Sequence, residues 1–520
     1  MPERFRTDAT LPSVFPGPAA SRSRMDLVLT IVFHPDTGRI GERCSVPAGN
    51  AELLLGRQHP DFARLSATTG VPLGDPHLSR RALGLSRRTA ALLLRRPADS
   101  CACRVDGEWL SGECELDSAR LQRGVILQLA HSVVLLLRQA EAVAPGMQAA
   151  GTAGLLGSSA YMYSLREQLT RTAHSGLDVL ISGETGTGKE LVARAVHACS
   201  ARAERPLVAV NMAAIPVGVA PAALFGSARG AFTGADRASS GYFQQAAGGS
   251  LFLDEVGDTP EHVQPQLLRA LQEREIQPVG GTPERVDVRV ISATEAELDA
   301  ADSGFRSALR HRLGSARLRL APLREHPEDI GELLCHFLRQ ACAETGTPPM
   351  LPDPASDPVA VARWADLFYS CQRHSWPGNI RELANCARQV VLDSAADPRT
   401  PVLVLPQSPA AVAESAGGRP EQPVQLGDEA LRSLLEQEHY EISRAARRAG
   451  MSRQALYRRL PQLGLRLASQ VPTGELQRAL HSCGGDAAQA AGHLRVSAVA
   501  LRARLRSSAA NARPEPDHGD

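Results

Sequence analysis

A chain of 520 residues is long enough for three or four domains, each with its own hydrophobic core. Its 57 basic and 56 acidic residues leave a net charge of +1, which excludes a global electrostatic field for nucleic acid, so any basic surface must be local. Ten cysteines lack paired spacing and indicate reduced thiols in a cytoplasmic protein. There is no secretory signal, and the longest apolar run, 125–137, is too short to cross a bilayer.

The N-terminal third alternates short apolar runs with turns. Residues 1–24 are rich in Pro, Ser and Arg and are predicted to be disordered. The spacing from 25 to 139 favours an all-β sandwich. Three landmarks lie in it: Gly56-Arg57, Leu78-Ser79-Arg80-Arg81-Ala82 and Asp106-Gly107. Together they resemble a forkhead-associated (FHA) domain, a module that reads phosphothreonine peptides.

The FHA resemblance assigns Arg57 and Ser79 to the phosphate and makes a phosphothreonine protein, marked by a Ser/Thr kinase, an expected partner. Two positions depart from the family. Ala82 stands where histidine is usual, and Asp106 replaces an asparagine, placing a carboxylate where it does not help an anionic peptide to bind. Two interpretations stay open: a phosphopeptide reader, and a degenerate domain used only for protein contact.

After a linker, 140–153, an apolar run at 179–181 leads into a glycine-rich loop and then a helical pattern at 191–197. This strand, loop and helix is the context that a P-loop requires. Its glycines turn backbone N–H groups toward a polyphosphate, and the start of the helix adds partial positive charge. Lys189 is the only lysine among the 57 basic residues, which indicates that this position needs a compact ammonium. The nucleotide-binding residues expected from the loop are Gly183, Glu184, Thr185, Gly186, Thr187, Gly188, Lys189 and Glu190.

A second apolar strand, 250–253, ends in two carboxylates, Asp254 and Glu255. At the carboxyl end of a parallel strand, Asp254 can hold Mg²⁺ and Glu255 can polarise the attacking water. The sequence therefore predicts an ATPase with ATP and Mg²⁺ at this edge. Between the two motifs, the small-residue hexapeptide 230–235 displays one aromatic ring and one hydroxyl, which is typical of a loop tip that contacts another molecule.

The motifs GETGTGKE, GAFTGA, LFLDE, FRSALRHRL and WPGNIREL together resemble bacterial enhancer-binding proteins, the AAA+ activators of sigma-54 RNA polymerase. The resemblance covers about 154–395 and implies an α/β ATPase subdomain at 154–325, a helical lid at 326–395 and a hexameric ring. In that family the hexapeptide contacts sigma-54 and transmits ATP hydrolysis to the closed promoter complex. The resemblance assigns this role to Gly230, Ala231, Phe232, Thr233, Gly234 and Ala235.

The resemblance also implies roles for single residues at the nucleotide. Asn211 restrains the catalytic glutamate, although by itself it reads as an ordinary strand-end residue. Thr294 senses the γ-phosphate, and Arg381 senses nucleotide in cis. Arg306 and Arg312, six positions apart, match arginine fingers supplied to a neighbouring subunit, where they neutralise transition-state charge.

Two departures from the activator family bear on coupling. Glu295 follows Thr294 where asparagine is usual, so an anion there either repels nucleotide or points away. Ser227-Ala228 precedes the hexapeptide where His and an acidic residue are common.

The C-terminal part begins with a Pro/Ala/Ser-rich linker, 396–425. Residues 426–466 read as a helix-turn-helix of the Fis-like type, with its second helix capped by Ser452. Arg453, Gln454 and Tyr457 lie early enough in that helix to meet bases, and Arg458 suits phosphates.

The same pattern recurs 45 residues later, which predicts a second, diverged helix-turn-helix at 470–508 before the tail, 509–520. Over 426–507 there are 13 Arg against 7 Asp and Glu, and this local basicity supports DNA binding. A helical dimerisation module is the alternative.

The expected fold is thus multidomain: an all-β FHA-like sandwich, an α/β AAA+ ATPase with an α-helical lid, and an all-α tandem helix-turn-helix. The expected function is activation of sigma-54 RNA polymerase holoenzyme from upstream enhancer DNA by ATP hydrolysis. Two other readings are a DNA-binding regulator whose ATPase only switches assembly, and a phosphopeptide adaptor with a vestigial motor. The intact hexapeptide favours the first reading over the second, and the presence of Lys189, Asp254, Glu255, Arg306 and Arg312 argues against a vestigial motor.

Overall fold

The computed structural model describes residues 25–49, 51–88, 91–141, 154–231, 237–295, 305–395, 397, 400–405, 428–438, 440, 445, 456, 459–460, 463, 465–466, 471–484, 486–497 and 501. The predictions for residues 1–24 and for the tail, 509–520, lie outside these ranges. The chain divides into two units, 1–409 and 410–520, each described separately below.

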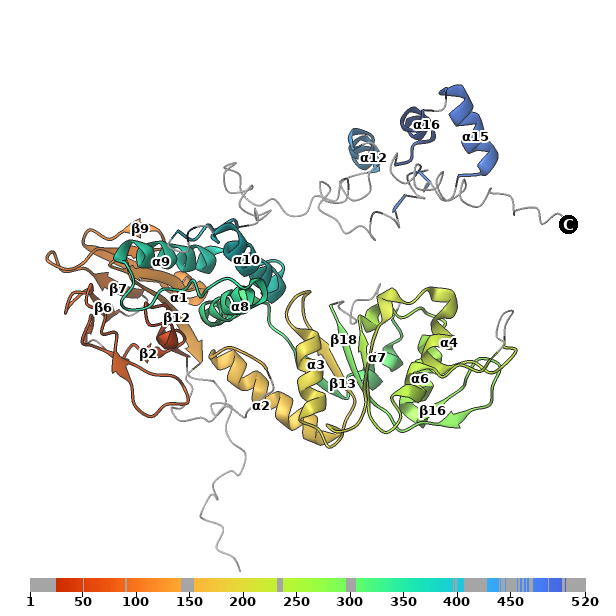
Figure 1. Ribbon diagram of the computed structural model, residues 1–520, viewed down its shortest axis with the longest axis horizontal. Helices are drawn as coiled ribbons and strands as arrows, with labels where there is room; N and C mark the ends of the chain where they lie inside the picture. The colour runs from red at the N-terminus through yellow and green to blue at the C-terminus, as the bar shows by residue number, and fades with distance from the viewer. Residues whose placement is uncertain are drawn as a thin grey trace, which may run out of the picture. The chain divides into compact units, whose positions relative to one another are not determined.

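Two antiparallel sheets enclose one apolar core in the N-terminal part of the first unit (Figure 1). One sheet has the order β2-β1-β12-β11-β8-β9 and the other β10-β7-β6-β3. Alternate residues of β1, such as Leu27, Leu29 and Ile31, point into this core, as the period of two in a strand requires. The elements are β1 Met25–Phe33, β2 Arg43–Ser45, β3 Leu53–Leu55, β4 Asp61–Phe62, β5 Val71–Pro72, β6 Leu83–Arg87, β7 Ala91–Arg95, β8 Cys103–Val105, β9 Glu108–Trp109, β10 Glu113–Asp117, α1 Ser118–Arg123, β11 Val125–Leu129 and β12 Val133–Glu141.

The central part is a five-stranded parallel sheet with helices on both faces. Its order, β14-β15-β18-β13-β19, places the strand before the P-loop, β13, inside the sheet. On β15, Phe252 packs on one face while Leu251 and Leu253 pack on the other, so each face receives its own layer of helices. The strands are β13 Val179–Ser182, β14 Leu207–Asn211, β15 Ser250–Asp254, β18 Arg289–Thr294 and β19 Ala316–Arg319.

Helices α2 and α3 cover one face of this sheet, and α4, α5, α6 and α7 cover the other. The helices are α2 Ala160–Ser175, α3 Lys189–Ala198, α4 Ala220–Phe225, α5 Tyr242–Gln245, α6 Gln264–Glu273 and α7 Ser307–Leu313, with a small hairpin of β16 Glu275–Ile276 and β17 Glu284–Arg285. The predicted strand, glycine loop and helix around Lys189 are confirmed by β13 and α3.

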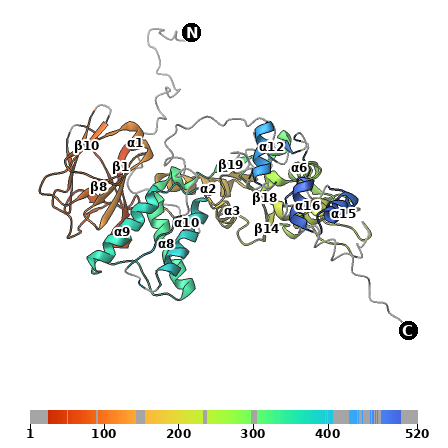
Figure 2. The same ribbon diagram turned by 90° about the horizontal axis from the view of Figure 1, so that it is seen from above.

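Three helices form the lid: α8 Ile330–Thr345, α9 Pro358–Arg373 and α10 Asn379–Asp393. The sequence predicts that each domain has its own core, but six residues of the N-terminal domain belong to the core of the lid. Figures 1 and 2 both show α8 and α9 against that part of the chain. The apolar faces of β1 and β12 that point away from the sandwich core therefore lie on the lid rather than in solvent. The six residues are Val32, Phe33, Ile40, Ile126, Val134 and Leu136.

The second unit contains three described helices, α12 Asp428–Gln437, α15 Thr473–Ser482 and α16 Ala487–Leu494. Within the described residues of the whole chain, no helix is both long and apolar enough to span a membrane.

Candidate functional site

The polar residues predicted at the nucleotide converge because their strands are parallel. Ser182, which precedes the P-loop, is paired with Thr294, and Asn211 is paired with Asp254. Parallel strands present their carboxyl ends at one edge of the sheet, where ligands bind in open α/β folds. The P-loop, both carboxylates and Thr294 thus share one edge.

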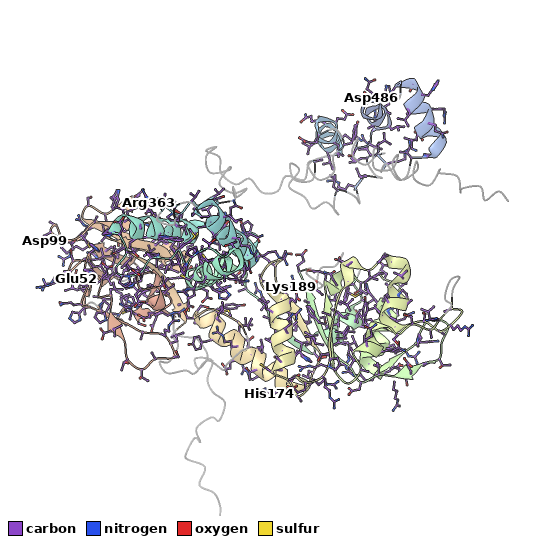
Figure 3. The ribbon with its side chains drawn as sticks, viewed as in Figure 1. Glu52, Asp99, His174, Lys189, Arg363 and Asp486 are labelled. Carbon is purple, nitrogen blue, oxygen red and sulfur yellow. The ribbon has the colours of Figure 1, made fainter. Side chains whose placement is uncertain are left out.

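Lys189 is the first residue of α3, and its side chain is buried at the start of that helix (Figure 3). Its Nζ donates to the carbonyl of Gly183 at 3.0 Å and lies 3.6 Å from Glu255 Oε1. Gly186 and Gly188 have φ of +80° and +92°, a region that only glycine enters without strain. The loop therefore has the backbone conformation and the cation that a polyphosphate requires.

Glu255 follows β15 in the left-handed region, with φ of 50°, which is costly for a glutamate. Burial raises the pKa of its carboxyl, while the nearby Lys189 ammonium lowers it. Its Oε2 accepts the backbone N–H of Glu295 at 3.4 Å. Glu295 itself does not point away from the site, as one reading of the sequence allowed, because its carboxylate accepts the hydroxyl of Thr185 in the P-loop.

The lid touches the P-loop through a set of contacts that the sequence did not predict. The buried Asn379 donates through Nδ2 to the carbonyl of Thr185 at 3.0 Å and to Glu184 Oε2 at 3.2 Å, and its Oδ1 accepts the N–H of Leu323. Arg324 donates to both carboxylate oxygens of Glu184, at 2.6 and 2.8 Å. The hydrogen bonds from Arg324 and Asn379 lower the pKa of Glu184 to about 2, against the effect of burial.

Arg381, the predicted sensor, is exposed at the start of α10, and its backbone N–H donates to the carbonyl of Gly186 at 3.3 Å. A Cβ on Gly186 would lie 2.2 Å from the carbonyl oxygen of Gly378, so this glycine is required for the lid to approach. The lid and the P-loop thus form one surface around the site.

Beside the P-loop lies a mainly apolar pocket that suits the base of a nucleotide. It is bounded by the segment before α2, by α3, by the end of β19 and by the lid. No sequence motif marks these residues, because most of them are ordinary apolar side chains. They include Leu155, Leu156, Tyr161, Leu320, His326 and Ile380.

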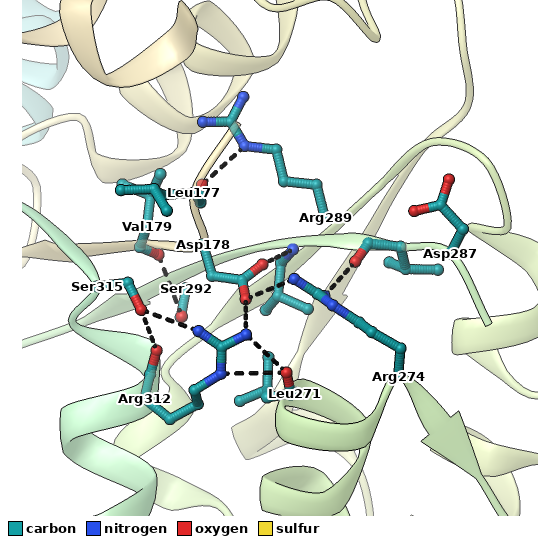
Figure 4. A network of polar contacts seen from close by, with 12 residues as sticks. Leu177, Asp178, Val179, Leu271, Arg274, Asp287, Arg289, Ser292, Arg312 and Ser315 are labelled. Carbon is teal, nitrogen blue, oxygen red and sulfur yellow. Dashed lines mark hydrogen bonds and ion pairs between the residues drawn. The ribbon is translucent and has the colours of Figure 1, made fainter. Parts of the chain in front are cut away.

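The two arginines predicted as fingers lie in different environments. Arg306 precedes α7 and is exposed. Arg312 instead donates to the carbonyl of Leu271 at 2.7 Å and lies 3.5 Å from the buried carboxylate of Asp178 (Figure 4). Arg274 pairs with the same carboxylate at 3.0 Å, so Arg312 belongs to a network at the beginning of β13 within its own subunit.

Residues 155–319 match the family model "Sigma-54 interaction domain", and 324–400 match "AAA+ ATPase lid domain". The DNA-binding transcriptional regulator NtrC of Klebsiella pneumoniae is 39% identical over 350 residues, which is 60% of this chain and 71% of that protein. The transcriptional regulatory protein ZraR of Salmonella typhimurium is 40% identical over 349 residues, covering 66% and 75%.

The chain belongs to the NtrC-like sigma-54-dependent activators. Its central domain is an AAA+ P-loop ATPase with its lid. Among solved structures, NtrX from Brucella abortus in complex with ATP is 34% identical, with a TM-score of 0.43, over 60% of this chain and 70% of that one.

In this activator the base of the hexapeptide loop is described, although its tip is not. Ser227 bridges both Ser239 and Val279, so two loops are joined there. Ala231 lies next to Gly280, since a Cβ on that glycine would lie 3.0 Å from Ala231 Cβ, and the predicted contact residues Phe232, Thr233, Gly234 and Ala235 lie outside the described residues. Asn211, expected to restrain Glu255, is exposed, and within the described part of the chain the partners of Glu255 are Lys189 and Glu295.

The landmarks of the N-terminal domain lie in two different regions of the structure. Arg57 and Ser79 lie on neighbouring loops, since the N–H of Arg57 donates to the carbonyl of Ser79 at 3.0 Å. Asp106 is instead a turn residue with φ of 49° that accepts Ile126 N–H and pairs with Arg120 at 2.7 Å. Its carboxylate is therefore occupied within the fold.

Ser79 also lines a hollow of about 830 Å³, which we call the arginine hollow. Glu52 and Asp99, both labelled in Figure 3, are among its lining residues. Arg95 is held by Glu52, whereas Arg80 and Arg81 are exposed. The other lining residues are Leu54, Arg96 and Pro97.

In the second unit of the activator, the residues predicted to contact DNA, Arg453, Gln454, Tyr457 and Arg458, lie outside the described residues. The internal repeat is nevertheless visible in the packing. Leu431, Ala445 and Leu456 are buried in one cluster, and the residues 45 positions later occupy the same roles in a second cluster. Those residues are Leu476, Ala490 and Leu501.

Proposed function

We propose that this chain uses ATP hydrolysis to convert closed complexes of sigma-54 RNA polymerase into open complexes. The observation that carries the proposal is the meeting of Lys189 and Glu255 at the edge of the sheet, in a chain that also retains the complete hexapeptide. A cation for the phosphates and a base for water are the two parts that nucleotide hydrolysis needs.

Within the site, Lys189 and the N–H groups of residues 183–190 bind the phosphates of ATP, and Glu255 orients the attacking water. Asp254 offers the hard oxygen that Mg²⁺ prefers, and Mg²⁺ in such sites usually has only one or two carboxylate ligands beside phosphate and water. The residues present therefore fit MgATP. When bound, Mg²⁺ supplies charge neutralisation at the phosphates. Thr294 and Arg381 report the state of the γ-phosphate to β18 and to the lid.

The two predicted fingers have separate roles in this proposal. Arg306 is exposed and free to reach the nucleotide of a neighbouring subunit in a hexameric ring. Arg312 secures α7 to Leu271 and Asp178, and so sets the position from which Arg306 extends. An arginine supplied in trans makes hydrolysis depend on assembly.

Phe232 and Thr233 make the contact with sigma-54 at the loop tip. The joined loops at Ser227, Ser239 and Val279 give that tip a common base with residues 277–281. Enhancer DNA is bound by the tandem repeat in 426–508, with Arg453, Gln454 and Tyr457 toward bases and Arg458 toward phosphate. The packing repeat between Leu431 and Leu476 supports two such modules rather than one.

The N-terminal domain regulates the motor by reading a phosphothreonine protein. Ser79 with the exposed Arg80 and Arg81 supports this ligand, because guanidinium groups bind phosphate oxygens in pairs. A phosphothreonine peptide and its unphosphorylated twin, titrated against wild type and Ser79→Ala, test this part. Equal binding of the two peptides would favour a domain used only for protein contact.

The motor proposal is tested by open-complex formation with purified sigma-54 holoenzyme on a supercoiled promoter template. Wild type with ATP should give open complexes, whereas Lys189→Ala or a non-hydrolysable ATP analogue should give none. Hydrolysis without open complexes, even with phosphorylated partner present, would favour a regulator whose ATPase only switches assembly.

A further inference from the structure

The N-terminal domain and the lid meet in a built interface. Phe33 of β1 and Phe368 of α9 pack with ring centroids 4.9 Å apart. Three ion pairs surround this apolar contact: Arg64 with Glu332 at 2.6 Å, Arg104 with Asp366 at 3.2 Å, and Arg138 with Glu328 at 3.3 Å. A buried apolar centre with charged margins is the anatomy of a specific interface.

Gly331, in the first turn of α8, makes the close approach possible. A Cβ at this position would lie 2.4 Å from the carbonyl oxygen of Val32 and 3.0 Å from Ile40 Cγ2. Both are atoms of the N-terminal domain, and neither is the end of a flexible side chain. Alanine is otherwise the better helix former by about 1 kcal/mol. The lid helix alone would therefore favour alanine, and only the docked domain requires glycine.

A buried carboxylate, Asp329, lies just before α8 at the junction of three parts of the chain. It accepts the N–H of Ser159 at 2.8 Å and contacts His326 Nδ1 at 2.8 Å through its other oxygen. Burial raises the pKa of Asp329, but the hydrogen bonds from His326 and Ser159 and the charge of Arg43 outweigh it, so the pKa is lowered. The carboxylate thus fixes both the lid and the segment that enters α2.

His326 connects this carboxylate to the nucleotide site. Its ring stacks on Tyr161 with centroids 4.7 Å apart, and both rings line the apolar pocket beside the P-loop. Tyr161 is held in turn, because its hydroxyl accepts the N–H of Ala321 at 2.9 Å. Any shift of Asp329 therefore moves the wall against which a base would lie.

The N-terminal domain reaches the same junction from the other side. Arg43 of β2 is 9% exposed, and within the described part of the chain its Nε and one terminal nitrogen have no hydrogen-bond partner. Its charge acts on Asp329. The hydroxyl of Ser158 donates to the carbonyl of Gly41 at 3.3 Å, next to the backbone N–H that Asp329 accepts. A buried cation with unmet donors favours an anionic neighbour.

We propose that the N-terminal domain docks on the lid and sets the affinity of the ATPase for nucleotide through Asp329 and His326, a junction that it contacts where Gly41 meets Ser158. The inference rests on the proposed binding of ATP at the P-loop. A signal received by the N-terminal domain then reaches the ATPase as a change in the wall of the apolar pocket. It passes through the docked interface rather than along the linker. By linkage, nucleotide in the pocket stabilises docking to the same extent.

The test compares the full-length wild type with Gly331→Ala, which places a methyl group against the Val32 carbonyl while favouring the α8 helix. Gly218→Ala is the matched control, since a Cβ at Gly218 meets nothing within 4 Å. Two quantities are measured: hydrogen exchange of backbone amides in β1 and α8, and the dissociation constant of a fluorescent ATP analogue with Mg²⁺. We expect Gly331→Ala to speed exchange in β1 and to weaken nucleotide binding about fivefold or more.

A double-mutant cycle that combines Gly331→Ala with His326→Ala tests whether the coupling passes through the ring of His326. If the coupling passes through this ring, Gly331→Ala should change the dissociation constant by less than about twofold once His326 is replaced. Additive effects would overturn the route through His326. Unchanged exchange in β1, or faster exchange with unchanged affinity, would overturn the proposal as a whole. Failure of wild type to bind the analogue at all would instead count against the proposed ATP site.

Discussion

Lys189 Nζ lies 3.6 Å from Glu255 Oε1, joining the first residue of α3 to the end of β15. The two residues are 66 positions apart in sequence, and the parallel sheet brings them to one edge. In the proposed ATPase, Lys189 binds the phosphates of ATP and Glu255 orients the attacking water. Each residue is also held by a hydrogen bond of its own: Lys189 donates to the carbonyl of Gly183, and Glu255 accepts the backbone N–H of Glu295.

Replacement of Lys189 by alanine should reduce ATP hydrolysis by at least about 100-fold, because the phosphates lose the ammonium that neutralises them. Lys189→Arg is the informative partner variant. A planar guanidinium does not fit where a point charge lies between two phosphates, so it too should fail. Steady-state hydrolysis measures the loss of catalysis, and binding of a fluorescent ATP analogue measures the loss of nucleotide affinity. Near-normal activity of Lys189→Arg would show that charge alone suffices.

Hydrolysis should depend on pH through Glu255. Burial raises the pKa of this carboxyl above its ordinary value of 4.5, so it gains a proton at a higher pH than an exposed glutamate. A protonated carboxyl cannot accept a proton from water, and the rate should therefore fall as pH is lowered through that raised pKa. The profile of kcat against pH measures this. Glu255→Gln should be slow at every pH, without the acid limb of the wild-type profile.

Asn379→Gly should loosen the lid on the P-loop. Glycine tolerates the local φ of 52° without strain, so the change isolates the loss of the amide and its three contacts. Leaving Leu323 N–H and Thr185 C=O without that partner should cost about 1–3 kcal/mol. We expect nucleotide affinity to fall about tenfold while the N-terminal domain stays docked. Calorimetric titration with ADP checks it, and unchanged affinity would contradict a role for the lid contact.

Arg306→Ala and Arg312→Ala should have different consequences. Arg306 is exposed, so its loss should leave Tm within experimental error and remove most hydrolysis. Arg312→Ala removes one partner of the buried Asp178 and should lower stability by about 1–3 kcal/mol. Mixing Arg306→Ala with Lys189→Ala subunits should restore part of the activity, because each then supplies what the other lacks. No recovery on mixing would argue against a finger in trans.

Much of the catalytic edge could be predicted from the sequence because its residues occur in short motifs. Lys189 follows glycines at fixed spacing, and Asp254 and Glu255 terminate an apolar strand. The uninterrupted apolar run Leu251-Phe252-Leu253 predicts a buried strand, and the structure places its two faces under different layers of helices. Short motifs of this kind specify the local backbone conformation, so they can be recognised without knowledge of the tertiary contacts.

The contacts between domains could not be predicted in this way. Glu184 and Arg324 are 140 residues apart, and nothing near either one marks the other as its partner. Strand β1 is a nearly continuous apolar run, as expected of a strand buried on both sides, but the helices that cover Val32 and Phe33 lie about 300 residues later. Arg312 matched a finger motif by position, whereas its contact with Asp178 depends on the packing of α7 against β13.

Thr233→Ala tests most directly whether ATP hydrolysis drives the polymerase through the hexapeptide loop. The measurement is open-complex formation by sigma-54 holoenzyme, made in parallel with ATP hydrolysis on the same preparations of wild type and variant. We expect Thr233→Ala to hydrolyse ATP at a rate within about twofold of wild type and to form no open complexes. Open complexes at the wild-type level in Thr233→Ala would contradict it.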